Sequence, residues 1–456
     1  MINLHKLKNI YFLGIGGIGM SALARYFNLH GKTVKGYDKT PTTLTDELIA
    51  EGMHITFDDS LETLDKNADL VVYTPAIPKD SIQLNYYLQS GIPMQKRAQV
   101  LGAVADEAFN ISIAGSHGKT STSSITAHIL KSANKDVAAF LGGICINFNS
   151  NFINGTAYAI AEADEFDRSF LNLHPNIALI TSVDTDHLDI YGNLKAIEDS
   201  FSLFCENIRN NGVCIANATV KQEILNQKVK NLRYSLHDRS ADFYAENIRI
   251  ENGSYIFNVI HPDGKLVDIV SYYGGRHNIE NAIGAIAIAL EVGVNETDIR
   301  NAIETFRGVK RRFETHIKNE KHIYIDDYAH HPRELDAALL SAKELYPDKK
   351  ITAAFQPHLF SRTRDLCDEF AASLSKIDQL ILLDIYPARE KPIEGVTSKI
   401  IFDKVTIADK HLMTKNELTD FIRNHKDDIE VLLTVGAGDI DTKVREITEI
   451  LNEPMN

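Results

Sequence analysis

The sequence predicts an α/β protein of three domains, and three observations lead to this prediction. The chain has 456 residues, and roughly 150 residues per domain is a useful prior for such a length. Short apolar runs alternate with amphipathic stretches along the chain, as they do in βαβ units. Two glycine-rich turns each connect an apolar run to a helical pattern, which is typical of nucleotide-binding sheets. We therefore expect Rossmann-like first and third domains and a central domain of the phosphate-loop type.

The first βαβ unit carries a glycine motif of the dinucleotide-binding kind. Gly14-x-Gly16-x-x-Gly19 lies between a strand expected at residues 9–13 and a helix expected at 20–29. Glycines at this turn allow a pyrophosphate to approach the backbone, and the helix N-terminus favours its negative charge. A second strand ends on Asp38, whose carboxylate could accept hydrogen bonds from a ribose. NAD is the simplest ligand for this motif, and a tight turn without a ligand is the alternative. The second strand is expected at residues 33–37, and further strands are expected at 70–73 and 92–94.

The second block begins with a phosphate-loop pattern. An apolar strand at 110–114 is followed by a glycine loop and a helix at 120–132. In such a loop the backbone N–H groups surround the phosphates, the lysine neutralises the terminal ones, and the threonine hydroxyl ligates magnesium. The spacing departs from the full Walker pattern, because Ile113 stands where the first glycine belongs. The expected phosphate-binding residues are Gly115, Ser116, His117, Gly118, Lys119, Thr120 and Ser121.

Carboxylates follow the next two strands of this block, which we expect at 157–161 and 177–181. The first group comprises residues 162–167 and begins with Glu162, and the second contains Asp184 and His187. A carboxylate beside a phosphate loop is where nucleotide-bound magnesium needs an oxygen ligand. The alternatives are a solvated acidic loop and a structural histidine. Two further candidates, His277 and Asn281, stand at the start of a helix expected at 278–291, where Asn281 could read a base edge and Asn278 could cap the helix.

The third block repeats the pattern, with strands expected at 322–325, 351–355, 379–385 and 429–435. Polar residues follow each of these strands, among them Tyr328, His330, His358, Arg362 and Arg364. An arginine is suited to binding a substrate carboxylate, and polar strand ends on a third domain could close over a nucleotide.

Composition excludes several functional classes. Lys plus Arg number 48 against 62 for Asp plus Glu, a formal charge of −14 that disfavours nucleic acid and anionic lipid as partners. The four cysteines form no CxxC pair, which argues against a zinc knuckle or a disulfide scaffold. No apolar run is long enough to span a membrane, and the start of the sequence does not resemble a signal peptide. We expect a cytoplasmic protein with no membrane partner, and its oligomeric state stays open.

The motifs together predict two phosphate-bearing ligands. A dehydrogenase needs no Lys–Thr phosphate loop, and a plain ATPase needs no GxGxxG domain. Two such sites with a third α/β domain suit the ATP-driven joining of two substrates. An NAD-dependent oxidoreductase and a non-catalytic nucleotide sensor are the alternatives from other classes.

The order of the motifs resembles that of the Mur ligase family over essentially the whole chain. The resemblance is carried by residues 14–21 (GIGGIGMS), 114–121 (AGSHGKTS), 162–170 (EADEFDRSF), 184–192 (DTDHLDIYG), 275–282 (GRHNIENA), 306–314 (FRGVKRRFE), 326–332 (DDYAHHP), 355–366 (FQPHLFSRTRDL) and 436–440 (GAGDI). Within the family, the start GGIGMS and the stretch FQPHLFSRTRD resemble members that join L-alanine to UDP-N-acetylmuramate. Members that join a recycled tripeptide to the same sugar are the closest alternative.

The resemblance implies the ligands of each site. The first glycine loop would bind the UDP part of UDP-N-acetylmuramate rather than NAD, through Gly14, Gly16, Gly17, Gly19, Met20, Ser21, Asp38 and Arg97. ATP would bind residues 115–121, with His277 and Asn281 near the adenine and Arg312 approaching the nucleotide. Thr120 and Glu162 would serve one Mg²⁺ and His187 a second. The catalytic set would be Lys119, Glu162, His187 and Arg312.

The resemblance also implies the role of the third domain. Tyr328, His330, His358 and Arg362 match the region where the amino acid and the closing domain meet. Leu359 stands where relatives frequently carry Arg, which leaves Arg362 or Arg364 to bind the alanine carboxylate. Ser182 replaces a common Asn, and residues 96–99 match the usual Arg-Arg-Ala-Glu only in part. The expected domains are 1–106 for the UDP-sugar, 107–312 for ATP, and 313–456 for amino-acid binding and closure.

Overall fold

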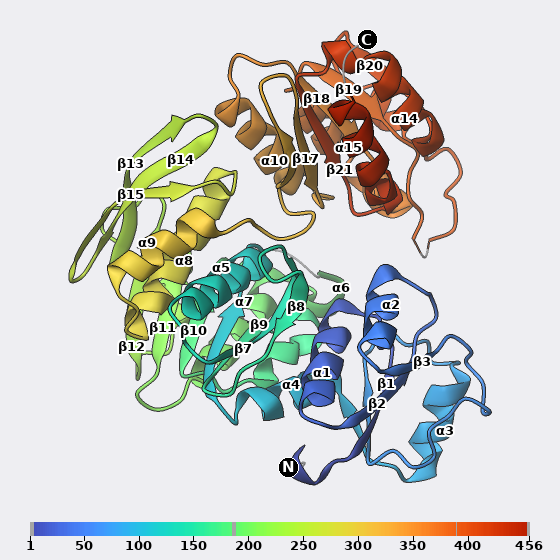
Figure 1. Ribbon diagram of the computed structural model, residues 1–456, viewed down its shortest axis with the longest axis vertical. Helices are drawn as coiled ribbons and strands as arrows, with labels where there is room; N and C mark the ends of the chain where they lie inside the picture. The colour runs from blue at the N-terminus through green and yellow to red at the C-terminus, as the bar shows by residue number, and fades with distance from the viewer. Residues whose placement is uncertain (1–3, 185–187, 389, 454–456) are drawn as a thin grey trace. The chain divides into compact units, whose positions relative to one another are not determined.

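The computed structural model describes residues 4–184, 188–388 and 390–453, and these residues form three β-sheets with flanking helices (Figure 1). The chain divides into two compact units. The first comprises Met1–Asn247, Phe257–Ile269 and Glu280–Phe306, and the second comprises Ile248–Ile256, Val270–Ile279 and Arg307–Asn456. The expected α/β fold class is confirmed, with two doubly wound sheets at the ends of the chain and a larger sheet between them in sequence.

The first sheet is parallel throughout and has the strand order β3-β2-β1-β4-β5. Its strands are β1 (Asn9–Leu13), β2 (Thr33–Tyr37), β3 (His54–Thr56), β4 (Leu70–Tyr73) and β5 (Met94–Lys96), and its helices are α1 (Ile18–Leu29), α2 (Thr43–Ala50), α3 (Ile82–Ser90) and α4 (Arg97–Ala105), preceded by the turn η1 (Leu4–Lys6). The central strand β1 is apolar on both faces, as a strand covered by helices on both sides must be. The strand expected at 92–94 begins two residues later, because Pro93 has no N–H to donate to the sheet.

The second sheet has ten strands in the order β15-β14-β13-β12-β11-β10-β6-β9-β7-β8. The strands are β6 (Phe109–Ala114), β7 (Val137–Cys145), β8 (Ser150–Ile153), β9 (Tyr158–Ala163), β10 (Ile177–Ile180), β11 (Val213–Asn217), β12 (Lys230–Ser235), β13 (Phe243–Glu251), β14 (Ser254–His261) and β15 (Gly264–Ser271). The helical segments are α5 (Lys119–Ser132), η2 (Phe166–Asn172), α6 (Leu188–Tyr191), α7 (Leu194–Glu206), η3 (Gln222–Ile224), α8 (Arg276–Glu291) and α9 (Glu296–Thr305). Strand β9 runs to Ala163, so Glu162 lies within the strand and not after it as expected.

The strands β13 to β15 are absent from our sequence prediction. The β13–β14 connection is Asn252-Gly253, and both residues have positive φ, 53° and 64°. This combination is the signature of a two-residue type I′ hairpin turn. The hairpin was therefore recognisable from the Asn-Gly pair between two alternating segments.

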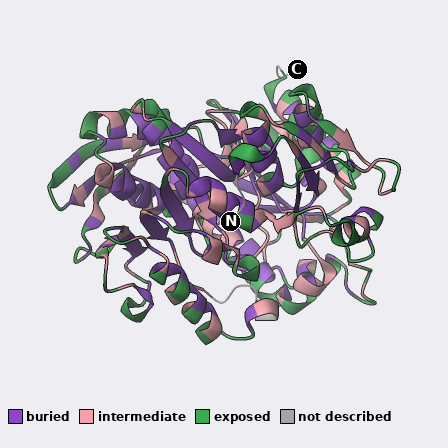
Figure 2. Cartoon of the chain, turned by 90° about the horizontal axis from the view of Figure 1, so that it is seen from below, coloured by how far each residue is buried: buried purple, intermediate pink, exposed green. Residues whose placement is uncertain are grey.

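The third sheet has the order β16-β17-β21-β18-β19-β20, and only β16 is antiparallel to its neighbour. Its strands are β16 (Glu314–Lys318), β17 (Ile323–Asp327), β18 (Ile351–Phe355), β19 (Gln379–Leu382), β20 (Lys410–Leu412) and β21 (Val431–Val435). The helical segments are α10 (Pro332–Leu345), α11 (Phe360–Asp365), α12 (Cys367–Leu374), α13 (Lys399–Phe402), α14 (Lys415–Asn424), η4 (Lys426–Asp428), η5 (Asp439–Lys443) and α15 (Val444–Asn452). Figure 2 shows the sheet strands mostly buried, with exposed residues concentrated on outer helices and loops. Among the described residues, no helix has the length and apolarity needed to cross a bilayer.

Buried His128 makes the stability of the central fold depend on pH. Its ring packs against Phe148 and Phe306, and Nε2 lies 3.0 Å from the hydroxyl of Thr305. Burial lowers the pKa of His128 to about 4, against about 6.5 for an unfolded chain. Between these values the unfolded state binds a proton that the folded state does not. The free energy of unfolding therefore falls as the pH falls below 6.5.

We expect His128 to contribute a loss of about 2 kcal/mol in unfolding free energy between pH 7 and pH 5. Urea unfolding of the wild type and of His128→Gln at both pH values measures this contribution. The variant has no titrating ring at this position, so its stability should decrease less on acidification. An equal decrease in both proteins would contradict the assignment.

Candidate functional site

The first glycine loop is fixed by backbone bonds to the neighbouring strand. The N–H groups of Gly14 and Ile15 both donate to the carbonyl of Tyr37, at 2.8 and 3.1 Å. The Asp38 carboxylate accepts the N–H of Gly16 at 2.8 Å. Asp38 therefore fixes the loop beside β2. The same residue was expected to bind a ribose. Helix α1 begins at Ile18 and directs its first N–H groups toward the loop.

The other residues expected at the UDP-sugar site lie at both ends of this loop. The Arg97 guanidinium stands beside Gly19, where an added Cβ would be 2.9 Å from Nη1. Met20 and Ser21 are buried in the core, and the Ser21 hydroxyl accepts a hydrogen bond from Asn151 at 2.8 Å. Contacts of these two residues with a ligand would therefore come from the backbone.

Two glycines of the loop differ in the space around them, which gives a matched pair of variants. An added Cβ at Gly16 would lie 2.8 Å from Thr45 Cγ2 and 2.9 Å from Asp38 Oδ2, whereas at Gly17 the nearest atom is 3.4 Å away. We expect Gly16→Ala to destabilise the ligand-free protein by about 1–3 kcal/mol and Gly17→Ala to change it little. Thermal unfolding measures both. Equal melting temperatures would contradict the tight packing at Gly16.

The second glycine loop joins β6 to α5, and the lysine at the start of α5 hydrogen-bonds back to the loop. The Lys119 ammonium donates to the carbonyl of Gly115 at 2.5 Å and to the Glu165 carboxylate at 2.7 and 3.1 Å. Gly115 has φ +135°, and an added Cβ would lie 2.0 Å from the Thr181 hydroxyl oxygen, so only glycine fits there. The strand–loop–helix context expected for a phosphate loop is therefore present.

Oxygen donors gather beside this loop at Glu162. Its carboxylate accepts hydrogen bonds from the Thr120 hydroxyl at 3.1 Å, the Ser123 hydroxyl at 3.0 Å and the Gly142 N–H at 2.6 Å. Burial raises the pKa of Glu162, and its hydrogen bonds and Lys119 act in the opposite direction. A hydroxyl and a carboxylate next to a phosphate loop are the hard oxygen ligands that Mg²⁺ prefers. These residues therefore fit a nucleotide-bound magnesium ion.

The segment after β10 forms hydrogen bonds with the phosphate loop. The Ser182 carbonyl accepts the N–H of Ser116 at 3.1 Å, and the Ser182 hydroxyl accepts the N–H of His117 at 3.2 Å. Asp184 donates its N–H to the Ser116 hydroxyl at 2.9 Å. Ser182, which replaces a common Asn, therefore fixes the loop through its own hydroxyl. The expected metal ligand His187 lies outside the described residues.

The Asn281 side chain lies beside Gly118 of the phosphate loop. Its side-chain oxygen accepts a hydrogen bond from Thr122 at 3.3 Å, and an added Cβ at Gly118 would lie 2.5 Å from it. The helix starts at Arg276, before the expected position, and the Asn278 amide donates to the carbonyl of Gly274 at 2.6 Å. His277 stands exposed in the first turn of α8.

Four of the residues expected at the amino-acid site form one cluster in the second unit. Ring centroids of Tyr328 and His330 are 5.3 Å apart, and those of His330 and His358 are 6.0 Å apart. The Arg362 guanidinium lies 3.4 Å from His358 Nδ1. Arg364 is separate from this cluster, since it pairs with Asp365 at 2.7 Å. Of the two arginines left open by the sequence, Arg362 is therefore the one placed beside the imidazoles.

Both imidazoles of this cluster are held neutral. Burial, together with His330 and Arg362, lowers the pKa of His358 to about 4. Burial also lowers the pKa of His330, with Arg362 and Arg312 acting in the same direction and Glu334 opposing them. At neutral pH both rings are therefore uncharged and weak bases.

Two adjacent arginines have different environments. Both guanidinium groups lie over the Tyr328 ring, Arg311 at 5.1 Å and Arg312 at 5.4 Å from its centroid. Arg311 is more constrained, since it binds Asp326 at 3.3 Å and the carbonyls of Gly436 and Gly438. Asp326, Glu314 and His316 also form a group whose possible metal-ligating atoms lie within 4.8 Å of one another. Because Arg311 already supplies positive charge there, we interpret this group as an ion-pair network.

Sequence reasoning missed the separate partners of the acidic stretch. Asp164 faces Arg97, Glu165 faces Lys119, and Asp167 pairs with Lys96. The sequence shows the cluster but not the directions of its side chains, since two residues with positive φ, Asp167 and Arg168, turn the chain within it. Arg311 was missed because the basic run at 310–312 gives no signal that separates its members.

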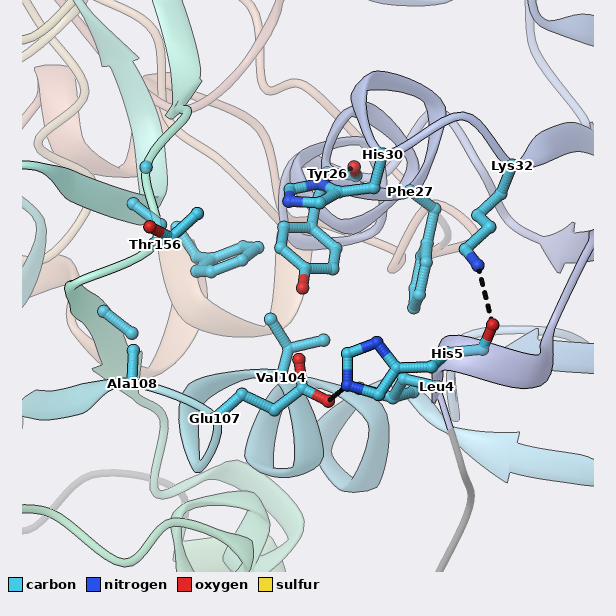
Figure 3. Close-up of a pocket in the computed structure, with 14 residues that line it drawn as sticks. Leu4, His5, Tyr26, Phe27, His30, Lys32, Val104, Glu107, Ala108 and Thr156 are labelled. Atoms are coloured by element: carbon cyan, nitrogen blue, oxygen red, sulfur yellow. Dashed lines mark hydrogen bonds and ion pairs between the residues drawn. The ribbon is translucent and has the colours of Figure 1, made fainter.

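A cavity of about 320 Å³ lies at the other end of α1 and contains none of the expected site residues (Figure 3). Its floor is apolar, with Phe27, Val104 and Phe140, and its rim carries the His5–Glu107 pair at 3.4 Å and Lys32. The glycine loop stands at the opposite end of the same helix. This cavity is therefore separate from the predicted UDP-sugar site.

Three family models match consecutive parts of the chain. They are described as Mur ligase family, catalytic domain, for residues 9–109, Mur ligase middle domain for 113–289, and Mur ligase, glutamate ligase domain, for 311–439. The chain is 48% identical to the UDP-N-acetylmuramate–L-alanine ligase of Flavobacterium psychrophilum over 99% of its own length and 100% of that protein. It is also 48% identical to the ligase of the same name from Parabacteroides distasonis, covering 99% and 98% of the two chains.

Solved structures agree with this similarity. The UDP-N-acetylmuramate–alanine ligase of Thermotoga maritima superposes with a TM-score of 0.84 and 27% identity, covering 97% of this chain and 98% of that chain. The murein peptide ligase of Psychrobacter arcticus has a TM-score of 0.69 and 24% identity over 98% and 100%, which shows a shared fold. Three consecutive domain matches and full-length relatives at this identity leave one conclusion: the chain belongs to the Mur ligase family.

Proposed function

We propose that this protein joins L-alanine to the carboxylate of UDP-N-acetylmuramate at the expense of ATP, giving UDP-N-acetylmuramoyl-L-alanine, ADP and phosphate. The observation that carries the proposal is the similarity, over both full lengths, to relatives named for this reaction. The placement of Lys119, Thr120 and Glu162 around one phosphate loop supports the ATP-dependent step. The reaction would be the first amino-acid addition to a peptidoglycan precursor, in the cytoplasm.

The phosphate loop would transfer the terminal phosphate of ATP to the sugar carboxylate. The loop N–H groups at the start of α5 and the Lys119 ammonium would stabilise the charge on the transferred group. The product of this step is an acyl phosphate, which the amine of L-alanine attacks while phosphate leaves. Arg312 would approach the nucleotide, with Asn281 and His277 on the adenine side.

Magnesium would be held by Thr120 and Glu162, and a second ion by His187 with the phosphates. When bound, the ions would neutralise charge on the phosphate oxygens and align them for transfer. Thr120 and Ser123 orient the Glu162 carboxylate through their hydroxyls, so its oxygens already face the loop. The count of two ions rests on the family resemblance.

The third domain, residues 313–456 by our boundaries, would bind L-alanine and close over the acyl phosphate. Arg362 would bind the alanine carboxylate, and the neutral rings of His330 and His358 would add no positive charge beside the alanine ammonium. A neutral amine is required because an ammonium has no lone pair. Exclusion of water by closure would protect the acyl phosphate from hydrolysis. Residues 1–106 would bind the UDP-sugar and 107–312 the ATP.

The alternative is the joining of a recycled tripeptide to the same sugar. The phosphate loop and acidic stretch serve both reactions, so the amine must be tested directly. Phosphate release from ATP and UDP-N-acetylmuramate should be measured with L-alanine, glycine, L-serine and the tripeptide. We expect the highest kcat/KM with L-alanine, and release with the tripeptide alone would reverse the assignment.

A further inference from the structure

The acidic segment after β9 contacts Lys119 of the phosphate loop and also Arg97, which stands beside Gly19 of the first glycine loop. Asp164 lies 3.7 Å from Arg97 and Asp167 lies 2.7 Å from Lys96, and both of these cations flank the first sheet. Glu165 lies between these two carboxylates in sequence and binds Lys119 of the phosphate loop. We propose that residues 164–168 couple the first glycine loop to the phosphate loop. Glu165 is a positioning residue for Lys119. Asp164 makes the position of Glu165 depend on whether a ligand is bound to Arg97.

The contact between Glu165 and Lys119 controls where the ammonium stands. The Glu165 side chain is 3% exposed, and its carboxylate oxygens lie 2.7 and 3.1 Å from Lys119 Nζ. A buried carboxylate is costly without a positive partner, so the pair is retained in the absence of ATP. ATP phosphates need the same ammonium. Glu165 therefore competes with them for Lys119.

The backbone of the segment fixes Glu165 in this direction. Asp167 and Arg168 have positive φ, 51° and 53°, which non-glycine residues rarely adopt in succession. The Glu165 carbonyl accepts the Tyr191 hydroxyl at 2.5 Å, and Phe170 is fully buried against Phe204 at 5.1 Å between centroids. One end of the segment is thus anchored in the core, and its strained turn is held in place by surface ion pairs.

Those ion pairs are weak enough to be displaced. Asp167 and Lys96 are 40% and 45% exposed, and the Asp164–Arg97 pair is long at 3.7 Å. Exposed pairs of this kind contribute little to stability because water and salt screen them. A ligand anion that forms charge-assisted hydrogen bonds with Arg97 would therefore outcompete Asp164.

Arg97 stands where such an anion is proposed to bind. Its guanidinium lies beside Gly19 at the N-terminus of α1, so the coupling rests on the proposed UDP-sugar site. Binding there would release Asp164, relax the segment and weaken the hold of Glu165 on Lys119. The UDP-sugar should thus raise the affinity for ATP, and ATP should raise the affinity for the UDP-sugar by the same factor.

Calorimetry on the full chain tests the coupling with a non-hydrolysable ATP analogue and Mg²⁺, with and without saturating UDP-N-acetylmuramate. For the wild type we expect an increase in analogue affinity of about tenfold when the sugar is present. Asp164→Asn should reduce this ratio to less than about twofold while the sugar still binds. Glu165→Gln should bind the analogue tightly without the sugar, because the competing charge is gone. Glu198→Gln, which removes a carboxylate paired with Lys221 elsewhere, should keep the wild-type ratio.

A merely structural role would change stability or both affinities together and would leave the ratio intact. If Glu165→Gln does not fold, Asp164→Asn decides alone, since its pair is partly exposed. A wild-type ratio near one, or an unchanged ratio in Asp164→Asn, overturns the coupling. Absence of any sugar binding to the wild type overturns the proposed function instead, and with it this inference.

Discussion

Replacing Lys119 by alanine should abolish ATP-dependent ligation, with a loss of about 10³-fold or more in kcat. The ammonium is the one side-chain cation placed inside the phosphate loop among the described residues, 2.5 Å from the Gly115 carbonyl. Its charge would stabilise the phosphate oxygens most strongly during transfer. UDP-N-acetylmuramate should still bind within a few-fold of the wild-type affinity, because Lys119 belongs to the phosphate loop and not to the first glycine loop. Phosphate release and calorimetry measure the two effects.

Two controls separate this effect from misfolding. Lys131→Ala removes an exposed lysine from the last turn of the same helix and should leave activity unchanged. Lys119→Ala also leaves the buried Glu165 carboxylate without this partner, which costs stability. The double variant Lys119→Ala/Glu165→Gln removes both charges, so it should regain stability but not activity. Ligation near the wild-type rate in a folded Lys119→Ala protein would refute the phosphate-loop assignment.

Replacing Glu162 by glutamine should produce the second large effect, a decrease in kcat/KM of at least about 100-fold, beyond what is usual for residues that only support a metal ligand. The substitution preserves shape but removes the negative charge that the magnesium ion needs. The Glu162→Gln variant should also bind Mn²⁺ more weakly than the wild type does in the presence of a non-hydrolysable ATP analogue. Electron paramagnetic resonance of Mn²⁺ provides this readout independently of activity.

The neighbouring serine gives a matched control for Glu162. Ser123→Ala removes the hydroxyl that holds Glu162 Oε1 at 3.0 Å but leaves the carboxylate charge. Its effect on kcat/KM should be less than about tenfold, the lower end of what a supporting residue contributes. Equal losses in the two variants would mean that orientation matters and charge does not. Unchanged Mn²⁺ affinity in Glu162→Gln would remove this residue from the metal site.

Local patterns were sufficient for the nucleotide-type loops. The turn after β1 and the turn after β6 each require glycine for backbone geometry, and the strand before each one is buried after its first residue. Such signals involve residues close together in the chain, so they can be recognised in the sequence alone. The hairpin at Asn252-Gly253 had an equally local signal that we did not use.

Side-chain partners across the fold could not be obtained in this way. The sequence shows six residues at 162–167 with four carboxylates, but Glu162 lies inside β9, and Asp164, Glu165 and Asp167 each contact a different cation. Likewise, Arg362 and Arg364 are equivalent in sequence, yet only Arg362 stands beside His358. These differences depend on the residue at which each strand ends and on the side of the helix that each residue occupies.

The amino-acid sequence was therefore enough to establish the α/β class, the two glycine loops and the membership of a ligase family, because each rests on residues adjacent in the chain. Long-range packing assigned the individual partners: Lys119 with Glu165, Arg97 with Asp164, and His330 with His358 and Arg362. A contact between residues far apart in sequence depends on how whole sheets and helices pack, and that packing energy is spread over many residues and leaves no local pattern.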